Sequence, residues 1–287
     1  RRRHTRSLCD WSSDVCSSDL SKYGTMRLDN VSGEQVKWLE QDLKENKLPW
    51  VIAALHHPPY SAGSHNSDTE ADLTALRERL TPILEKYGVD LVISGHSHDY
   101  ERSKLMKGHT GLEATFNPSV NNLSSSSGFY NGTADSCPYI KGDNNEGTVY
   151  VVAGSGGYVD AASELKPGYP HDELPYAGAI GGSMILEVNE NKLNAQFLTS
   201  TANVFDQFTM FKNVSKNSTL NIESGKAVEL KASWNGGYNW SNGETSKSII
   251  VSPTSNTIYS VSDLYQCLVD SFSVKVLSTS EIGRAHV

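Results

Sequence analysis

Two histidine clusters contain the residue types in this sequence that could carry out chemistry. The first, residues 56–60, reads HHPPY, and the second, residues 95–102, reads GHSHDYER. Neutral imidazole is a good ligand for zinc and iron, and a His-x-His pair can reach two positions close to one centre. A single His-x-His is more often a polar loop. Two clusters that each follow a short apolar run favour a metal site, because open α/β sheets bind ligands where neighbouring strands end.

Two amphipathic helices are predicted beside these clusters. Residues 32–46 place apolar side chains at helical spacing, with Ser32 as the N-cap and Gln35 at the capping-box position. Residues 69–87 repeat such a stripe, and Gly88 is expected to end the helix. Each apolar stripe is expected to face a sheet.

The sheet itself is predicted from unalternating apolar runs at residues 50–55, 89–94 and 148–153. Such runs are typical of strands buried on both faces. The first two strands and the helix between them form a βαβ unit with both histidine clusters at its carboxyl edge. The glycine-rich run at residues 154–157 permits tight turning or close backbone approach, which we favour over phosphate binding because no helix pattern follows it.

The rest of the chain changes character twice. Residues 104–147 are rich in Gly, Asn and Ser and predict a long surface excursion. Alternating patterns at residues 183–189, 194–200 and 208–212 then predict antiparallel strands. From residue 218, short alternating strands separated by turn pairs such as Asn242-Gly243 predict a small β-sandwich.

The two ends of the chain do not read as natural protein. Residues 1–20 back-translate to an indexed sequencing adapter, and residues 281–287 back-translate to the reverse complement of the codons for residues 14–20. We therefore interpret both ends as adapter-derived and expect residues 1–20 to be disordered. The remaining residues, 21–280, are interpreted as an internal piece of a longer gene.

Composition excludes some classes of function. Residues 21–280 hold 20 basic and 29 acidic residues, a net charge of −9, which argues against a nucleic-acid-binding surface. No apolar run reaches the roughly 18–20 residues that a transmembrane helix needs. Cys137 and Cys267 are the cysteines outside the two ends, and they lie too far apart in sequence for a disulfide framework to be read.

The motifs together resemble a known family. Residues 55–60 (LHHPPY), with His65 nine positions beyond His56, and residues 95–103 (GHSHDYERS) are similar to the last two signatures of calcineurin-like metallophosphoesterases, and most similar to those of purple acid phosphatases. The resemblance covers roughly residues 25–212. It implies an α/β fold, here the C-terminal half of a metallophosphoesterase sandwich in which helices flank mixed sheets. Residues 213–280 resemble Ig-like or PKD-like modules of secreted bacterial enzymes, which implies a secreted or cell-surface location.

The resemblance also implies roles for individual residues. His56 and His96 would bind one metal ion and His98 the other, whereas His57 occupies a variable position and is not assigned as a ligand. His65 would contact the phosphate and protonate the leaving oxygen, although it also fits a solvated loop histidine. Tyr100, Glu101 and Arg102 would support the histidine loop from behind the metal ligands. His109 and His171 match no motif and are expected at the surface.

The implied activity is hydrolysis of a phosphorylated small molecule by two metal ions, iron with zinc or manganese. The family's Asp-x-His or Asp-x-Gly, Gly-Asp-x-x-Asp/Tyr and Gly-Asn-His-Glu motifs do not occur in this sequence. We therefore expect the intact protein to hydrolyse phosphate monoesters and this chain to be inactive. The alternatives are a phosphodiesterase or nucleotidase of the same superfamily and a noncatalytic surface-binding protein.

Overall fold

The computed structural model describes residues 33–142, 144–159 and 176–277. The predicted adapter-derived ends and His171 lie outside these residues. The chain divides into two compact units. Unit 1 takes its described residues from 33–125, 145–186 and 195–207, and unit 2 from 126–144, 187–194 and 208–277. The fold class is mixed α/β, as predicted.

The sheet that carries the histidine loops lies in unit 1. Its strands, in the order β1-β2-β5-β3-β6, are β1 (Ile52–Ala54), β2 (Leu91–Ser94), β5 (Val149–Ala153), β3 (Tyr100–Arg102) and β6 (Tyr176–Gly178). β2 is parallel to both β1 and β5, whereas β3 is antiparallel to β5 and β6. The three strands predicted from apolar runs are confirmed, each shorter than its run. β2 and β5 are almost wholly buried, as the unalternating pattern predicts.

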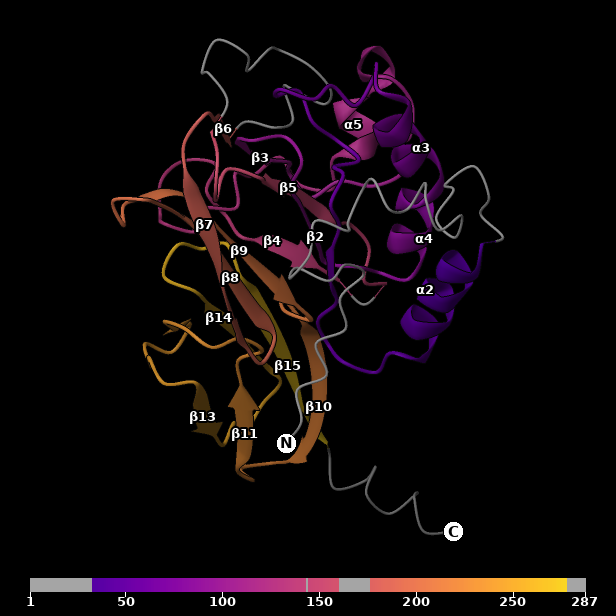
Figure 1. The fold of residues 1–287 in the computed structure, drawn as a ribbon. Helices are drawn as coiled ribbons and strands as arrows, with labels where there is room; N and C mark the ends of the chain where they lie inside the picture. The colour runs from indigo at the N-terminus through magenta and orange to yellow at the C-terminus, as the bar shows by residue number, and fades with distance from the viewer. Residues whose placement is uncertain (1–32, 143, 160–175, 278–287) are drawn as a thin grey trace, which may run out of the picture. The chain divides into compact units, whose positions relative to one another are not determined.

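Three helices lie together on one side of this sheet (Figure 1): α2 (Glu34–Glu45), α3 (Ala71–Arg79) and α4 (Thr81–Lys86). The N-cap of α2 is Gly33, which has no side chain to cap the helix, and Ser32 lies outside the described residues. The prediction of a single helix at residues 69–87 is wrong, because the chain forms two helices, α3 and α4, with a break at Leu80. Pro82, the second residue of α4, has no N–H to continue the α3 hydrogen-bond ladder.

The predicted apolar stripe nevertheless packs as expected. Leu39 of α2 and the side chains of Leu76, Leu80 and Leu84 are buried in one core with Val92 and Tyr150 of the sheet. Gly88 ends α4 with a φ of 69°, a left-handed conformation that glycine adopts without steric cost.

The segment predicted as a surface excursion, residues 104–147, is mostly exposed or half-buried, but it also holds short elements and some buried residues. It contains η1 (Glu113–Thr115), α5 (Pro118–Asn121) and β4 (Tyr139–Lys141), and Leu105, Met106 and Tyr139 are buried. Asparagine side chains of this segment form hydrogen bonds with its own backbone. Asn117 caps α5 by accepting from the Ser119 N–H, and the Asn121 side chain donates to the Lys107 carbonyl.

A second, four-stranded sheet has the order β4-β9-β8-β7. The strands β7 (Gly182–Asn189), β8 (Lys192–Thr199) and β9 (Val204–Lys212) confirm the three predicted strand positions. In β8 the buried residues Leu193, Ala195 and Phe197 alternate with more exposed ones, which is the pattern of a strand with one face on a core.

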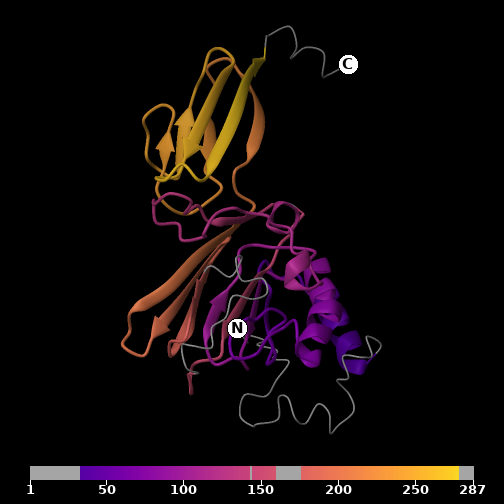
Figure 2. The same cartoon turned by 90° about the horizontal axis from the view of Figure 1, so that it is seen from above.

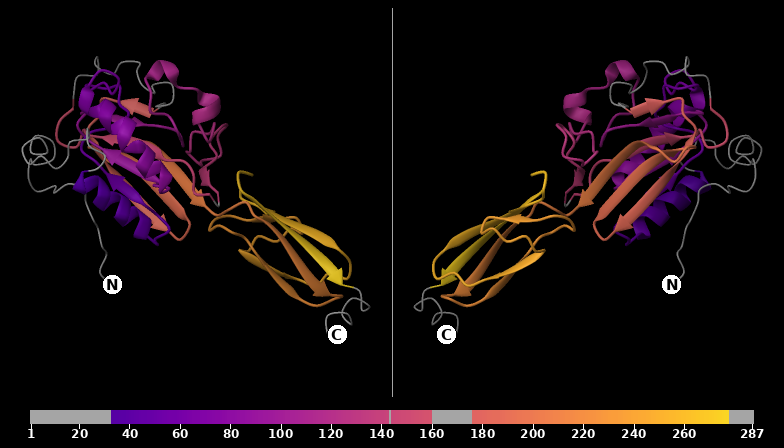
Figure 3. Two further views of the ribbon diagram at one scale, coloured as in Figure 1. Left: turned by 90° about the vertical axis from the view of Figure 1, so that its right-hand side faces the viewer. Right: turned by 90° about the vertical axis from the view of Figure 1, so that its left-hand side faces the viewer.

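The C-terminal part of unit 2 is all-β, with strands in two layers (Figures 2 and 3). One sheet has the order β10-β15-β14-β12 and the other pairs β11 with β13. The strands are β10 (Asn217–Glu223), β11 (Val228–Lys231), β12 (Asn239–Trp240), β13 (Ser248–Val251), β14 (Thr257–Ser262) and β15 (Val269–Leu277). Trp234, Leu230, Val261 and Val274 are buried in its core. Gly243, with a φ of 89°, makes the turn predicted at Asn242-Gly243.

A disulfide joins Cys137 and Cys267 in unit 2, with a Cα–Cα distance of 5.3 Å. Sequence reasoning did not find this pair, because its partners are 130 residues apart and one cysteine precedes β4 whereas the other lies between β14 and β15. No spacing rule links cysteines that only tertiary folding brings together. Disulfides persist in oxidising compartments such as the cell exterior.

The disulfide provides a prediction about stability. We expect the double variant Cys137→Ser/Cys267→Ser to lose roughly 2–5 kcal/mol of unfolding free energy in unit 2, because the cross-link restricts the unfolded chain. Denaturant unfolding followed by tryptophan fluorescence, to which Trp234 and Trp240 of unit 2 contribute, would measure it. Reductant should destabilise the parent chain by a similar amount and leave the double variant unchanged. Equal stability of the parent with and without reductant would contradict the prediction.

Candidate metal centre

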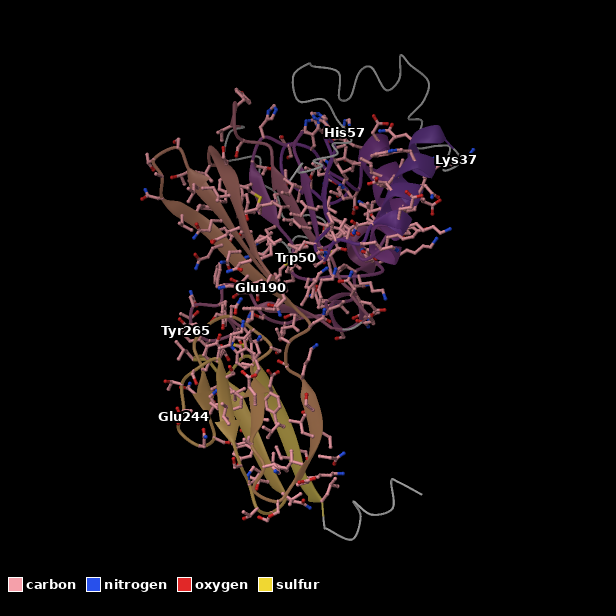
Figure 4. All side chains as sticks on the ribbon, turned by 90° about the horizontal axis from the view of Figure 1, so that it is seen from below. Lys37, Trp50, His57, Glu190, Glu244 and Tyr265 are labelled. Carbon is pink, nitrogen blue, oxygen red and sulfur yellow. A yellow bond between two sulfur atoms is a disulfide. The ribbon has the colours of Figure 1, made fainter. Side chains whose placement is uncertain are left out.

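The parallel pairing of β1 and β2 brings the two histidine clusters to one edge of the sheet. One residue separates His56 from the end of β1, and His57 comes next; one residue likewise separates His96 from the end of β2. A backbone hydrogen bond from the Gly95 N–H to the His56 carbonyl, 3.0 Å, joins the two loops directly. The side chain of His57, labelled in Figure 4, belongs to this loop cluster. The sheet register therefore positions the imidazoles.

Three imidazoles converge at this edge. His56 Nε2 lies 3.2 Å from His96 Nδ1, and the rings of His57 and His96 are centred 4.3 Å apart. Ligand atoms of His56, His57 and His96 all lie within 4.8 Å of one another, which suits a single metal ion. The structure thus brings together His56 and His96, two predicted ligands, and adds His57, which the sequence argument left out.

A second group of potential ligands shares His96 with the first. It consists of His65, Glu70 and His96, again with ligand atoms within 4.8 Å of one another. The His65 ring stacks on the His96 ring at a centroid distance of 3.8 Å. Glu70 Oε2 lies 2.9 Å from His65 Nδ1 and 4.0 Å from His96 Nε2. Sequence reasoning missed Glu70, although an acidic residue at the start of the predicted helix and five positions after His65 was a usable signal.

His98 lies close by but belongs to neither group among the described residues. Its ring meets the ring of Tyr158 edge to face, with centroids 5.1 Å apart, and its backbone N–H donates to Ser64 Oγ. The three predicted metal ligands therefore separate into a close pair, His56 and His96, and His98 beside it.

The cluster keeps its imidazoles neutral. Burial, followed by repulsion from His57, His65, His56 and His98, lowers the pKa of His96 to about 3. Burial also lowers the pKa of His56 and of His57. A neutral imidazole has a free lone pair and can bind a metal without first losing a proton.

These shifts predict acid sensitivity of the metal-free chain. The unfolded chain binds protons at histidine below pH 6.5, whereas folded His96 stays neutral down to about pH 3, so stability falls as pH drops through this window. We expect urea unfolding midpoints to fall less steeply with pH for His96→Asn than for the parent chain. The pKa of Glu101 is also shifted, but Glu101 is present in both proteins. The difference between the two curves therefore reports on His96. Parallel curves would refute the prediction.

The backbone at His96 is unusual. Its φ is 66°, in the left-handed region that residues with a side chain occupy only at a cost of about 1–3 kcal/mol. The loop is held there by close packing, because a Cβ on Gly154 would lie 1.9 Å from the Ser97 carbonyl oxygen. Gly154, in the predicted glycine-rich turn, is therefore a point of close backbone approach.

Glu101 supports the loop that carries His65. Its buried carboxylate accepts from Ser61 Oγ at 2.8 Å, from the Ala62 N–H at 3.0 Å and from the Gly63 N–H at 3.1 Å. Burial and the charge of Asp99 raise the pKa of Glu101 to about 8, against the opposing effect of these donors. A side chain on β3 thus fixes the backbone two residues before His65.

Tyr100 and Arg102, which flank Glu101, bind a different carboxylate. Arg102 Nε lies 2.6 Å from Asp206 Oδ2, and Arg102 Nη2 lies 3.0 Å from Oδ1. Tyr100 Oη donates to the same Oδ2 at 2.5 Å. Burial and Asp206 raise the pKa of Tyr100 well above its usual value. These contacts join β3 to β9 inside unit 1.

Comparison with known families agrees with this geometry. Residues 5–100, which include both histidine clusters up to Tyr100, match the model of the family described as calcineurin-like phosphoesterase. This part of the chain is similar to calcineurin-like phosphoesterases. The match ends within the second cluster, at the start of β3.

Proteins similar to this chain include acid phosphatases. Acid phosphatase A of Cryphonectria parasitica is 26% identical over 213 residues, which cover 71% of this chain and 36% of that protein. Purple acid phosphatase 15 of Arabidopsis thaliana is 31% identical over 130 residues, 44% of this chain and 18% of that protein. The match to the structure of a purple acid phosphatase from yellow lupin seeds has 22% identity and a TM-score of 0.45, covering 63% of this chain and 28% of that one. The chain spans about a third or less of the length of these proteins.

Two further histidines, His109 and His171, were expected at the surface. The surface prediction is wrong for His109, because its side chain is buried. His109 Nε2 lies 3.0 Å from Thr115 Oγ1, and the His109 carbonyl accepts a hydrogen bond from Tyr60 Oη. A histidine in a polar segment was taken for a solvent residue because the fold of that segment was not foreseen. His171 lies outside the described residues. Among those residues, no helix is both long and apolar enough to span a membrane.

Proposed function

We propose that the intact protein hydrolyses phosphate monoesters at a centre of two metal ions. The observation that carries this proposal is the convergence of His56, His57 and His96 at the ends of two parallel strands. Three neutral imidazoles within 4.8 Å are a donor set that suits zinc or iron, so the residues present fit a metal. We propose His56 and His96 as ligands of one ion and His98 as a ligand of the other, with iron and either zinc or manganese as the metals.

The chain's own residues would position the substrate. Bound metal ions supply Lewis-acid activation of the phosphate and of water. His65 would contact the phosphate and donate a proton to the leaving oxygen, and Glu70, 2.9 Å from His65 Nδ1, would fix the orientation of its ring. Glu101 would hold the His65 loop through residues 61–63, and Tyr100 and Arg102 would hold β3 through Asp206.

The chain by itself is proposed to be inactive. The carboxylate and amide ligand motifs expected of the family do not occur in its sequence. Among the described residues, the acid placed to bind a metal beside the histidines is Glu70, which already pairs with His65. β1 is an edge strand of the described sheet, and its Ile52 side chain is 39% exposed, which is consistent with further strands in a longer protein.

The test compares this chain with a version extended upstream to include the rest of the domain. With added iron, zinc or manganese, we expect the extended protein to hydrolyse 4-nitrophenyl phosphate and its His96→Ala variant to lose turnover. The present chain should show none. Turnover by the present chain that His96→Ala abolishes would refute the proposed inactivity, and no turnover by the extended protein would refute the hydrolase. Faster turnover of bis(4-nitrophenyl) phosphate would favour the phosphodiesterase alternative.

We further propose a secreted or cell-surface location in a bacterium. The Cys137–Cys267 disulfide supports an oxidising compartment. The proposed organisation is a phosphoesterase domain over residues 21–212 followed by an Ig-like or PKD-like sandwich over residues 213–280. The two-layered arrangement of β10 to β15 supports the second part.

A further inference from the structure

A pocket of about 630 Å³ lies in unit 1 beside His98. Three segments line it: the glycine-rich turn after β5 at residues 155–159, the approach to β7 at residues 181–183, and the end of β8 with its turn at residues 198–202. Its size is within the range of small-molecule sites. The edge-to-face contact of Tyr158 with His98, at 5.1 Å between ring centroids, connects the pocket with the proposed metal centre.

The lining has a distinctive chemistry. Hydroxyl groups come from Ser155, Ser183, Thr199 and Ser200, and no lining residue that the structure describes carries a charge. Tyr158, 63% exposed, presents an aromatic ring at the pocket. A neutral lining offers no cationic side chain to an additional phosphate group. Hydroxyls beside an aromatic ring instead suit a ligand that has both hydroxyl groups and an apolar face.

Two details indicate that the pocket is built for a polar ligand. The Ser155 hydroxyl is buried and has no hydrogen-bond partner among the described residues. Leaving such a group unsatisfied costs about 1–3 kcal/mol, which a ligand hydroxyl could recover. The wall around residue 182 is backbone, because a Cβ on Gly182 would lie 2.2 Å from the Leu198 carbonyl oxygen. The backbone of residues 182 and 198 therefore forms part of the pocket wall.

We propose that this pocket binds the uncharged sugar ring of a sugar phosphate and so selects the leaving group of the hydrolysed ester. Tyr158 would stack on the apolar face of the ring, and the serine and threonine hydroxyls would bond to its hydroxyls. This inference rests on the proposed function for the role of the sugar as a leaving group. The binding of the sugar itself does not require hydrolysis.

The test measures binding of phosphate-free sugars to the metal-free full chain. A panel of methyl pyranosides and free ribose would be titrated and followed by saturation-transfer NMR, and we expect at least one to bind with a Kd in the millimolar range. Tyr158→Ala should weaken binding about tenfold or more, and Tyr158→Phe should retain it. Gly157→Leu should block the pocket, because residue 157 lines it and a leucine side chain would occupy its space. The fold should tolerate the change, because a Cβ at Gly157 would meet nothing within 4 Å.

Tyr265→Ala serves as the control, because Tyr265 is also partly exposed, at 46%, but lies in unit 2. No binding by any sugar of the panel would overturn the proposal. Binding that Tyr158→Ala and Gly157→Leu leave unchanged would also overturn it, as would binding of 4-nitrophenol in the absence of sugar binding. Because these readouts need neither metal nor phosphate, failure of the hydrolase assay would leave the sugar result intact.

Discussion

The Arg102→Met variant is expected to lose about 3–5 kcal/mol of unfolding free energy in unit 1. Arg102 and Asp206 form a buried bidentate ion pair, with side chains 0% and 1% exposed. Removing the guanidinium leaves the Asp206 carboxylate buried without its main counter-charge. The Tyr100 hydroxyl would still donate to Asp206, but one neutral donor does not balance a buried charge.

Urea unfolding of the full chain, followed by far-UV circular dichroism, would measure the loss. Lys86→Met is the matched control, because Lys86 pairs with Glu40 at the surface, where ion pairs contribute about 0–1 kcal/mol. The double variant Arg102→Met/Asp206→Leu should recover much of the loss, since it leaves no unpaired charge. Equal effects of Arg102→Met and Lys86→Met would show that the buried pair has no special weight.

The His96→Gly variant is expected to weaken metal binding by about a hundredfold or more while making the metal-free chain more stable. Loss of a residue that merely supports a ligand typically costs 10–100-fold, so loss of the ligand shared by both histidine groups should cost at least as much. Glycine, in contrast, adopts the φ of 66° at this position without steric cost, so we expect a gain of about 1 kcal/mol.

Titration of the full chain with Zn²⁺ by calorimetry at neutral pH would give the affinity, and urea unfolding with a chelator would give the stability. His57→Ala should also weaken binding about tenfold or more, because His57 lies in the cluster with His56 and His96. His98→Ala should have little effect on the first ion, since His98 belongs to neither group. A stronger effect of His98→Ala than of His57→Ala would show that the metal-free geometry does not represent the site.

The sequence predicted the strands β1, β2 and β5 of the sheet and the approximate helix positions, because these depend on local apolar patterns. Runs such as residues 89–94 contain too few polar residues for a half-exposed strand, and they form the buried β2. The break between α3 and α4 was missed because the apolar stripe continues through it, although Pro82 interrupts the hydrogen bonds. The short helix α5 and the burial of Leu105 and Met106 were missed because the polar residues of this segment bond to its own backbone.

For the candidate site, the sequence predicted the meeting of His56 and His96, since strand ends fix where those residues lie. His57 and Glu70 were not predicted, because their positions depend on how the loops fold after the strands end. The role of Asp206 was equally inaccessible, because it lies 104 residues from Arg102 and is brought to it by β9. Contacts of this kind depend on tertiary structure and leave no local pattern.

The division of unit 2 among separate stretches of chain has a consequence for synthesis. Residues 126–144 leave the ribosome before the last segments of unit 1, residues 145–186 and 195–207, yet they belong to a unit whose described residues extend to 277. At a translation rate of 5–20 residues per second, Cys137 waits roughly 7–26 s for Cys267, which follows 130 residues later. Unit 1, whose last segment ends at residue 207, is complete first. The Cys137 thiol is therefore open to other oxidised partners during this interval, and an isomerase or a delay in oxidation would raise the yield of correctly paired protein.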